Sequence, residues 1–277
     1  MNKKILICAD DYAQNLEISQ GILALVALGR MNAVSCLTNS PDWLMHADSL
    51  KAIQKPCLVG LHLNLTWGDA LSHAWREHYG ARMPKLSWLI GKTHLRGLKA
   101  TSIHDELLAQ LDAFVLGMGR LPDFIDGHQH VHQLPQIRDV LLHVYRQKHL
   151  NGFIRRTTEN LLELFQSTGF PKRPLIAALG GMAFHRQLRQ TLIPCNTSFS
   201  GIYDFGQNLA YRQRFRQFLM QSRDGGLIMC HPGYASNDET DDIRASRPYE
   251  FDYFASDAFL EDMTELGFTF LTDGHHD

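Results

Sequence analysis

The sequence has 277 residues, of which 44% are hydrophobic and 20% are charged, and its formal net charge is −2. This composition is typical of a globular protein, and without a basic patch it does not favour nucleic acid as a partner. The five cysteines form no CxxC pair and lie in apolar runs, which favours free thiols in a reducing cytosol, so we predict a cytoplasmic protein.

No stretch of the chain predicts a membrane span or a division into domains. The first apolar run stops at Asp10, which is too short for a signal peptide, and Arg30 interrupts the apolar segment 21–37. Because no linker, repeat or block of charge occurs, we expect one domain over residues 1–277, with an irregular, lid-like insertion around 66–100.

Strand and helix patterns alternate along the chain, which predicts an α/β fold with a parallel sheet or barrel. The predicted strands are 4–9, 33–37, 57–65, 121–125, 152–156, 226–230 and 268–271. The predicted helices are 12–29, 41–53 with Ser40 as its cap, 102–117, 135–149, 209–222 and one within 248–267. Residues 157–200 have no clear pattern beyond a helix near 159–167.

The first strand, 4–9, has the continuous apolar pattern of a strand buried on both faces. It is followed by Asp10 and Asp11, two adjacent carboxylates that repel each other unless a cation or a shared proton intervenes. A metal site would supply such a cation. The alternative is that Asp11 caps the helix 12–29, which needs only one of the two carboxylates.

His62 lies near the carboxyl end of the apolar strand 57–65. A single histidine in such a strand is more often a hydrogen-bonded core residue than a ligand. The carboxyl ends of parallel strands, however, meet at one edge of the sheet, where active sites lie. Since Asp10 and Asp11 also follow a strand, the combination favours a functional site.

The stretch 66–100 lacks a regular pattern but contains Trp67, Trp75 and Trp88. Loops of this length are usually functional or disordered, and three tryptophans argue against disorder. One interpretation is a lid whose aromatic rings bind a sugar, and the alternative is a small satellite core beneath the loop. Trp67, close behind the strand of His62, is the candidate for a sugar-binding ring.

Three histidines, His128, His130 and His132, alternate behind the strand 121–125. If the chain stays extended, their side chains point the same way. At a rise of about 3.3 Å per residue, the three cannot share one ion, so further ligands must come from elsewhere. We expect that His130 and His132 do not both bind it, and that one of them orients a ligand. A solvated strand end is the alternative.

Two later strands also end in candidate residues. Arg155 or Arg156, at the end of 152–156, is a candidate for anchoring a carboxylate or a polar substrate, with an ordinary surface arginine as the alternative. His231 directly follows 226–230, and Tyr234 behind it is a further candidate for binding substrate.

These residue types suit metal-assisted hydrolysis. One carboxylate and two imidazoles leave open positions on zinc or a similar divalent ion, which lowers the pKa of a water and polarises a carbonyl. A second carboxylate can take the proton of that water, and a histidine across the site can protonate a leaving amine. The chain offers this set as Asp10, Asp11, His62, His128 and His231.

The candidate residues lie in four motifs, Ala-Asp-Asp-Tyr at 9–12, Gly-Leu-His-Leu-Asn-Leu-Thr at 60–66, Asp-Gly-His-Gln-His-Val-His at 126–132 and Cys-His-Pro-Gly at 230–233. In this order they resemble the motifs of the YdjC-like carbohydrate deacetylases, which include chitooligosaccharide deacetylases and are related to the NodB-type polysaccharide deacetylases. The resemblance implies a distorted (β/α) barrel of parallel strands with the active site at their carboxyl ends. It also implies one divalent metal ion, zinc or magnesium, and removal of an N-acetyl group from an amino sugar.

Position by position, the resemblance implies a role for each of five residues. Asp10 resembles the catalytic base and His231 the general acid. The residues that resemble the metal ligands are Asp11, His62 and His128.

The motifs depart from the family pattern at two places. Tyr12 stands where Phe followed by Gly is usual, and Gly-His-Gln at 127–129 replaces a more common Ser-His-His. The metal histidine is kept in spite of both changes. Arg155 matches a family arginine only loosely.

We therefore predict a metal-dependent hydrolase that removes the N-acetyl group from an amino sugar or a short N-acetylated oligosaccharide and releases acetate. A small carbohydrate is the expected partner, and a homodimer is left open. One alternative is a metal-dependent esterase or phosphoesterase with the same ligands, although the sequence has no glycine-rich phosphate loop. Another is a sugar-binding protein that needs a metal but has no catalytic activity.

Overall fold

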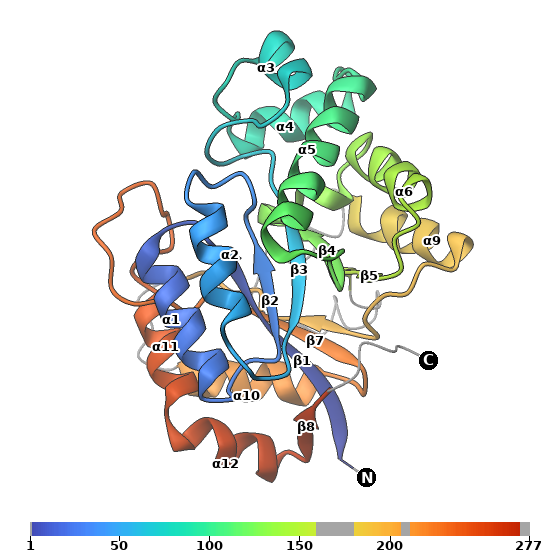
Figure 1. Ribbon diagram of the computed structural model, residues 1–277. Coiled ribbons are helices and arrows are strands. Elements are labelled where there is room, and N and C mark those ends of the chain that lie inside the picture. Colours follow the sequence, from blue (N-terminus) through green and yellow to red (C-terminus); the bar gives the residue numbers. More distant parts are fainter. Residues whose placement is uncertain (1, 159–179, 206–210, 272–277) are drawn as a thin grey trace.

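The structure is a computed structural model that describes residues 2–158, 180–205 and 211–271 (Figure 1). Its strands are β1 (Lys3–Tyr12), β2 (Ala33–Cys36), β3 (Leu58–Leu63), β4 (Phe124–Gly127), β5 (Phe153–Ile154), β6 (Phe199–Ser200), β7 (Gly226–Cys230) and β8 (Phe268–Phe270). Its helices are α1 (Leu16–Ala27), α2 (Trp43–Lys51), α3 (His73–Tyr79), α4 (Leu86–His94), α5 (Ala100–Met118), α6 (Ile137–Gln147), α9 (Met182–Thr191), α10 (Tyr211–Gln221), α11 (Arg247–Ala255) and α12 (Asp257–Glu265). A 3₁₀ helix, η1 (His128–Gln133), follows β4.

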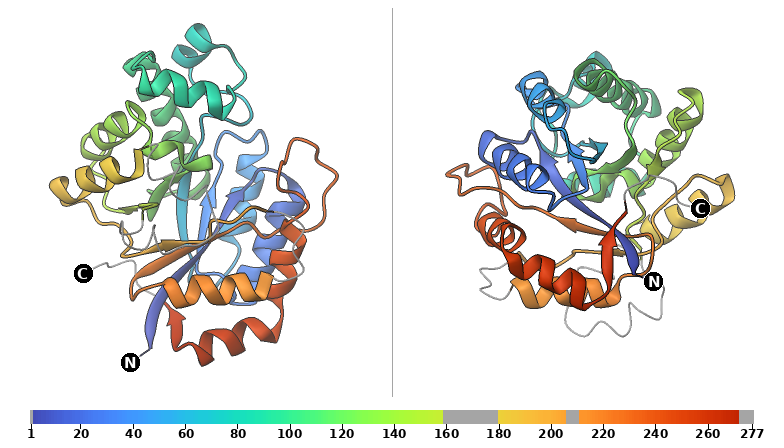
Figure 2. Two further views of the ribbon diagram at one scale, coloured as in Figure 1. Left: turned by 180° about the vertical axis from the view of Figure 1, so that it is seen from behind. Right: turned by 60° about the horizontal axis from the view of Figure 1, so that its bottom comes forward.

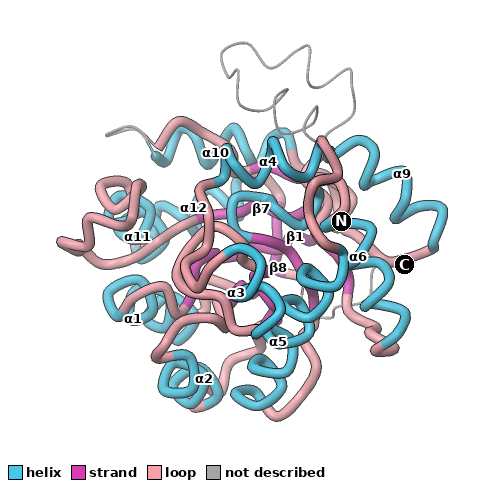
Figure 3. Tube along the Cα trace, turned by 90° about the horizontal axis from the view of Figure 1, so that it is seen from above, coloured by secondary structure: helices cyan, strands magenta, loops and turns pink. Residues whose placement is uncertain are grey.

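The described strands form one sheet in which all neighbouring pairs are parallel. Their order is β5-β4-β3-β2-β1-β7-β6, and β8 pairs with β1 outside this path. The helices surround the curled sheet on its outside, as Figure 2 (right) and Figure 3 show along its axis. The expectation of a distorted (β/α) barrel with parallel strands is confirmed.

Strand β1 pairs with three other strands of this sheet. One of its edges pairs with β7, while the other pairs first with β8 and then with β2. The side chain of Asn32 lies where the partner changes: its oxygen accepts the Ile7 N–H at 2.7 Å, and its nitrogen donates to the carbonyls of Ile5 and Leu271, each at 3.0 Å. Buried backbone groups need such partners. Asn32 therefore keeps β1 hydrogen-bonded across the junction.

The end of β1 differs from the expectation. The strand continues to Tyr12, and α1 begins only at Leu16, where the Asn15 side chain accepts the Ile18 N–H as the helix cap. Asp11 thus lies inside the strand, and its interpretation as a helix cap is wrong. Asn15, the polar residue directly before α1, caps the helix instead.

Two other expectations about helices need correction. The stretch 66–100 was expected to be irregular but contains α3 and α4, which Figure 1 places beyond the carboxyl ends of β2 and β3. Ser40 does not cap α2, because that helix begins at Trp43 behind Asp42 and has no side-chain cap. The helix predicted near 159–167 lies outside the described residues.

Several other predictions are met. Strand β7 has the predicted bounds, and all five cysteines are free thiols, as expected. Among the described residues, no helix combines the length and the apolar character needed to cross a bilayer.

Candidate metal centre and active site

Asp10 and Asp11 lie in a β-bulge near the carboxyl end of β1. The register between β1 and β2 shifts by one residue between Ala9 and Tyr12, so both aspartates face Ser35 alone. Successive side chains of a regular strand point to opposite faces, but a bulge redirects one of them. Asp11 accordingly has a left-handed backbone, with φ of 66°. The bulge explains how two adjacent carboxylates reach one cluster of side chains.

Asp11, His62 and His128 bring three donor atoms together, all within 4.8 Å of one another. Asp11 Oδ1 lies 2.8 Å from His128 Nδ1 and 3.4 Å from His62 Nε2. Ligands that bind zinc tetrahedrally at about 2.1 Å are roughly 3.4 Å apart, so the spacing is close to that of a zinc site. The donor set, one carboxylate and two imidazoles, also fits a divalent ion. The structure thus gathers the three predicted ligands at one place.

Asp126, to which the sequence assigned no role, orients His62. β3 and β4 pair the two residues in register, and His62 Nδ1 donates to Asp126 Oδ1 at 2.6 Å. Ser35 Oγ lies 2.9 Å from the same ring nitrogen. A proton held on Nδ1 leaves Nε2 for an ion. Burial alone would lower the pKa of His62, but Asp126 and the other nearby carboxylates raise it to about 10. Without an ion, these carboxylates therefore favour the protonated form of His62 at neutral pH.

Arg155 lies beneath this site and is completely buried. Its Nη1 and Nη2 bind Asp10 Oδ2 and Oδ1 at 2.6 and 2.7 Å, and Nη2 lies 2.5 Å from Asp126 Oδ2. Burial would lower the pKa of Arg155, but the two carboxylates raise it well above its ordinary value. The alternative of a surface arginine is wrong. The buried side chain also has no exposed atom with which to anchor a substrate.

A second group of potential ligand atoms, from Cys8, Asp10 and Asp126, lies deeper in the barrel. Arg155 Nη2 lies 3.0 Å from Cys8 Sγ and within 2.7 Å of both carboxylates. The guanidinium thus occupies the position that a cation would take. This group is an ion-pair cluster rather than a metal site.

The histidine run is a turn, so the condition that the chain stays extended past the predicted strand 121–125 is not met. β4 ends at Gly127, and the following 3₁₀ helix contains Gln129 and His130 with φ of 50° and 60°. Non-glycine residues seldom adopt this left-handed conformation, so an alternating pattern gives no sign of it. The turn sends the three imidazoles in different directions.

Each histidine of the run has its own surroundings. His128 reaches Asp11, as described above. The ring of His130 meets Phe199 edge-on, with centroids 5.7 Å apart. His132 is buried and donates from Nε2 to the carbonyl of Arg155 at 2.9 Å. His132 thus supports Arg155, the residue that binds Asp10, and does not itself orient a metal ligand.

His231 directly follows β7, the strand next to β1. Its side chain is 8% exposed, and its ring meets Phe205 edge-on at 5.1 Å. Its backbone N–H donates to Glu250 Oε2 at 2.7 Å. The predicted acid therefore lies at the same edge of the sheet as Asp10 and Asp11.

The two aromatic candidates for substrate binding differ in exposure. Trp67 is partly buried, its carbonyl accepts hydrogen bonds from Asn39 and Asn64, and its ring N–H has no partner among the described residues. Tyr234 is 37% exposed and packs edge-on against Phe251. Trp67 thus has an uncommitted donor, and Tyr234 an accessible ring.

Arg247 is another residue that the sequence did not reveal. Its Nη2 lies 2.8 Å from Asp11 Oδ2, although the two residues are 236 positions apart. Burial would raise the pKa of Asp11, but His128 and Arg247 hold it well below its ordinary value. Only the folded chain brings this arginine to Asp11, and no sequence pattern marks it.

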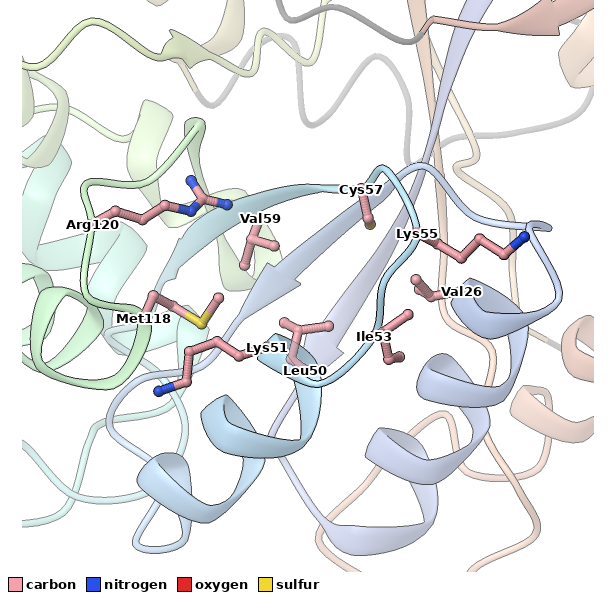
Figure 4. Close-up of a pocket in the computed structure, with 9 residues that line it drawn as sticks. All are labelled: Val26, Leu50, Lys51, Ile53, Lys55, Cys57, Val59, Met118 and Arg120. Atoms are coloured by element: carbon pink, nitrogen blue, oxygen red, sulfur yellow. The ribbon is translucent and has the colours of Figure 1, made fainter.

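A cavity of about 220 Å³ lies away from these residues (Figure 4). It is bordered by the ends of α1, α2 and α5 and by the start of β3, and Lys51, Lys55 and Arg120 join its apolar lining. His62 lies near the opposite end of β3. The cavity is therefore separate from the candidate metal centre.

This chain is similar to several known proteins. A chitooligosaccharide deacetylase of Yersinia enterocolitica is 26% identical over an alignment of 277 positions, gaps included, that covers 97% of each chain. A carbohydrate deacetylase of Danio rerio is 32% identical over 147 residues, which cover 51% of this chain and 46% of that protein. The crystal structure of a proposed cellobiose-phosphate cleavage protein from Enterococcus faecalis V583 matches with a TM-score of 0.73 at 20% identity, over 98% of this chain and 97% of that one.

The crystal structure supports the fold alone, because its sequence identity is low. The model of the family described as "YdjC-like protein" matches residues 4–265, which include all four motifs and every candidate metal ligand. This chain therefore belongs to the YdjC-like protein family.

Proposed function

We propose that this protein is a metal-dependent carbohydrate deacetylase that removes the N-acetyl group from an amino sugar or a short N-acetylated oligosaccharide. Two relatives are named chitooligosaccharide deacetylase and carbohydrate deacetylase, which supports hydrolysis of an amide bond. The observation that carries the proposal is the gathering of Asp11, His62 and His128 beside Asp10, with His231 at the end of the adjacent strand.

Asp11, His62 and His128 would hold one divalent ion. When bound, such an ion polarises the acetamide carbonyl and makes a water more acidic. Two imidazoles among three ligands favour zinc over magnesium, which prefers oxygen ligands.

Asp10 would take the proton of the attacking water. Arg155 binds both of its oxygens, which fixes the orientation of the carboxylate. Oδ1 also accepts the Cys8 thiol at 3.5 Å, whereas Oδ2 accepts Arg155 alone among the hydrogen bonds of the described residues and keeps a lone pair for a proton. The ion pair thus orients the base without blocking it.

His231 would give its proton to the amide nitrogen as the bond between that nitrogen and the carbonyl carbon breaks. Water adds to the carbonyl carbon, so the products are acetate and a free amino sugar. The position of His231 after β7, the strand adjacent to β1, supports its separation from the base Asp10. Trp67 and Tyr234 are the residues we propose to contact the sugar.

An acetate-release assay on N-acetylated chitooligosaccharides tests this proposal. We expect acetate from at least one oligomer, loss of activity after chelation and recovery when zinc is added back. An O-acetylated sugar and a phosphorylated sugar serve as parallel substrates. Release of phosphate, or of acetate from the ester alone, would contradict the proposed amide hydrolysis, and metal binding without turnover would indicate a sugar-binding protein.

A further inference from the structure

We infer that helix α11 fixes the two halves of the site, the candidate metal ligand Asp11 and the candidate acid His231, relative to each other. It does so through Arg247 and Glu250, which lie three residues apart in its first turn. Arg247 binds the candidate metal ligand Asp11, and Glu250 binds the main chain of the candidate acid His231. Neither residue touches a reacting atom, so both are positioning residues. The inference rests on the proposed function for the roles of Asp11 and His231.

Arg247 bridges two carboxylates and is only 1% exposed. Its Nη2 lies 2.8 Å from Asp11 Oδ2 and 3.1 Å from Asp241 Oδ1, and its Nε lies 2.6 Å from Asp241 Oδ2. A buried guanidinium needs such compensation. Arg247 binds Oδ2 of Asp11, whereas Oδ1 faces His62 and His128. The contact thus determines which oxygen is offered to an ion.

Asp11 has a particular need for this anchor. Its φ of 66° lies in the left-handed region, which is strained for a residue other than glycine and persists only where surrounding contacts enforce it. The bulge alone leaves the carboxylate free to turn about its side-chain bonds. Arg247 removes that freedom by binding Oδ2 of Asp11, the oxygen that does not face the two imidazoles.

Glu250 acts on the other half of the site. Its side chain is completely buried, and Oε2 accepts hydrogen bonds from the His231 N–H at 2.7 Å and from the Tyr211 hydroxyl at 3.1 Å. Oε1 accepts the Tyr203 hydroxyl at 2.5 Å. Three donors hold the carboxylate, and the carboxylate holds the main chain where it leaves β7. The position from which the His231 side chain leaves the main chain therefore depends on Glu250.

Close packing transmits the position of α11 to the turn behind His231. Figures 1 and 2 show α1 and α11 side by side, and the Gly233 N–H donates to the Arg247 carbonyl at 3.4 Å. A Cβ on Gly21 of α1 would lie 2.8 Å from Gly233 Cα, and one on Gly233 would lie 3.2 Å from Ile18 Cα. The turn is thus held between the two helices.

Zinc titration of the metal-free, full-length protein tests the role of Arg247. We expect Arg247→Gln to weaken zinc binding by about 10- to 100-fold, the usual effect of losing a partner of a metal ligand. The matched control is Arg244→Gln, because Arg244 is exposed and lies three residues away. It should bind zinc like the wild type. Arg247→Lys should give an intermediate affinity, because an ammonium cannot bridge two carboxylates in the same way.

Glu250→Gln tests the other half. We expect its zinc affinity to stay within about twofold of the wild type, while kcat for acetate release falls at least about tenfold and KM is unchanged. Circular dichroism and the melting temperature confirm that each variant is folded. If Arg247→Gln does not fold, Arg247→Lys replaces it under the same criterion.

Two results would overturn the inference. One is wild-type zinc affinity in Arg247→Gln or its replacement, and the other is a loss of zinc affinity in Glu250→Gln as large as that in Arg247→Gln. If the wild type releases no acetate from any sugar, the proposed function fails by itself, and the zinc titrations still decide the role of Arg247.

Discussion

Arg155 holds Asp10 by both carboxylate oxygens, at 2.6 and 2.7 Å, and the same guanidinium contacts Asp126. Asp126 in turn binds the ring of His62. One buried arginine therefore connects the candidate base with the residue that orients a candidate metal ligand. We expect a change at Arg155 to affect both.

Arg155→Met should lower the free energy of unfolding by about 3–5 kcal/mol, because it leaves two buried carboxylates without their counter-charge. Urea denaturation measures this loss. Arg120→Met is the control: Arg120 pairs with Asp123 at the surface, and losing such a pair costs about 1 kcal/mol or less. Equal effects of the two substitutions would show that the buried ion pair has no special weight.

Asp10→Asn should retain zinc but lose at least about 100-fold in kcat, since an amide does not accept a proton from water. The measurement combines metal analysis of the purified variant with the acetate-release assay. Asp11→Asn is the comparison, because it alters a candidate ligand and should reduce the zinc content itself. A fully active Asp10→Asn protein would exclude Asp10 as the base.

His231→Ala should reduce kcat and change the pH profile of kcat in one direction only. The wild type should lose activity at high pH, where the acid no longer carries a proton, and at low pH, where the base is protonated. The variant should keep the acidic limb and lose the alkaline limb. An unchanged alkaline limb would assign the acid to another residue.

Zinc binding should release a proton from His62, whose pKa is raised to about 10 in the absence of an ion. Below that pH, the affinity for zinc should increase about tenfold for each unit by which the pH rises, because the ion competes with one proton. Calorimetry in buffers of different ionisation enthalpy counts the proton. Asp126→Asn should release less, since Asp126 is the main group that raises this pKa.

The same shift predicts how the stability of the metal-free protein depends on pH. The folded state binds the His62 proton more tightly than the unfolded state, whose pKa is the ordinary 6.5. The contribution of this proton to the free energy of unfolding is fully present below pH 6.5 and is lost as the pH rises through about 10. Zinc should remove this dependence.

For His132 we expect the opposite pH dependence, a loss of stability as the pH falls. Burial lowers its pKa from 6.5 to about 4, so its contribution is complete above pH 6.5 and is lost as the pH falls towards 4. This shift corresponds to roughly 3 kcal/mol. Urea denaturation between pH 7 and 4.5 should show a shallower loss in His132→Gln, whose amide can still donate to the Arg155 carbonyl but does not titrate. Equal slopes would contradict the assignment.

The sequence predicted those parts of the fold and site that follow from a short stretch of chain. The apolar run of β7 gave its bounds without error, and His62 was placed correctly because a polar residue stands out at the end of an apolar strand. Parallel pairing then implied that such strand ends meet. This rule predicts only that the strand ends meet. The choice of Asp11 and His128 as partners of His62 came from the family resemblance.

The remaining features depend on geometry that short patterns do not encode. The turn at Gln129 and His130 uses left-handed backbone at residues that rarely adopt it, and the bulge at Asp11 uses it again. The two-residue strand β6 is too short to show a period. Arg247 lies so far from Asp11 along the chain that only the folded structure could reveal their contact.

Strand β1 is synthesised first, yet its partners β7 and β8 are synthesised last. Pairing between segments so far apart closes a long loop and is intrinsically slow. While the nascent chain waits for β7, one edge of β1 has no partner, and Asp11 lacks Arg247, which is made later still. Because Asp11 lacks its arginine in a product whose translation stops before α11, we expect zinc to protect that product from proteolysis less than it protects the 277-residue chain.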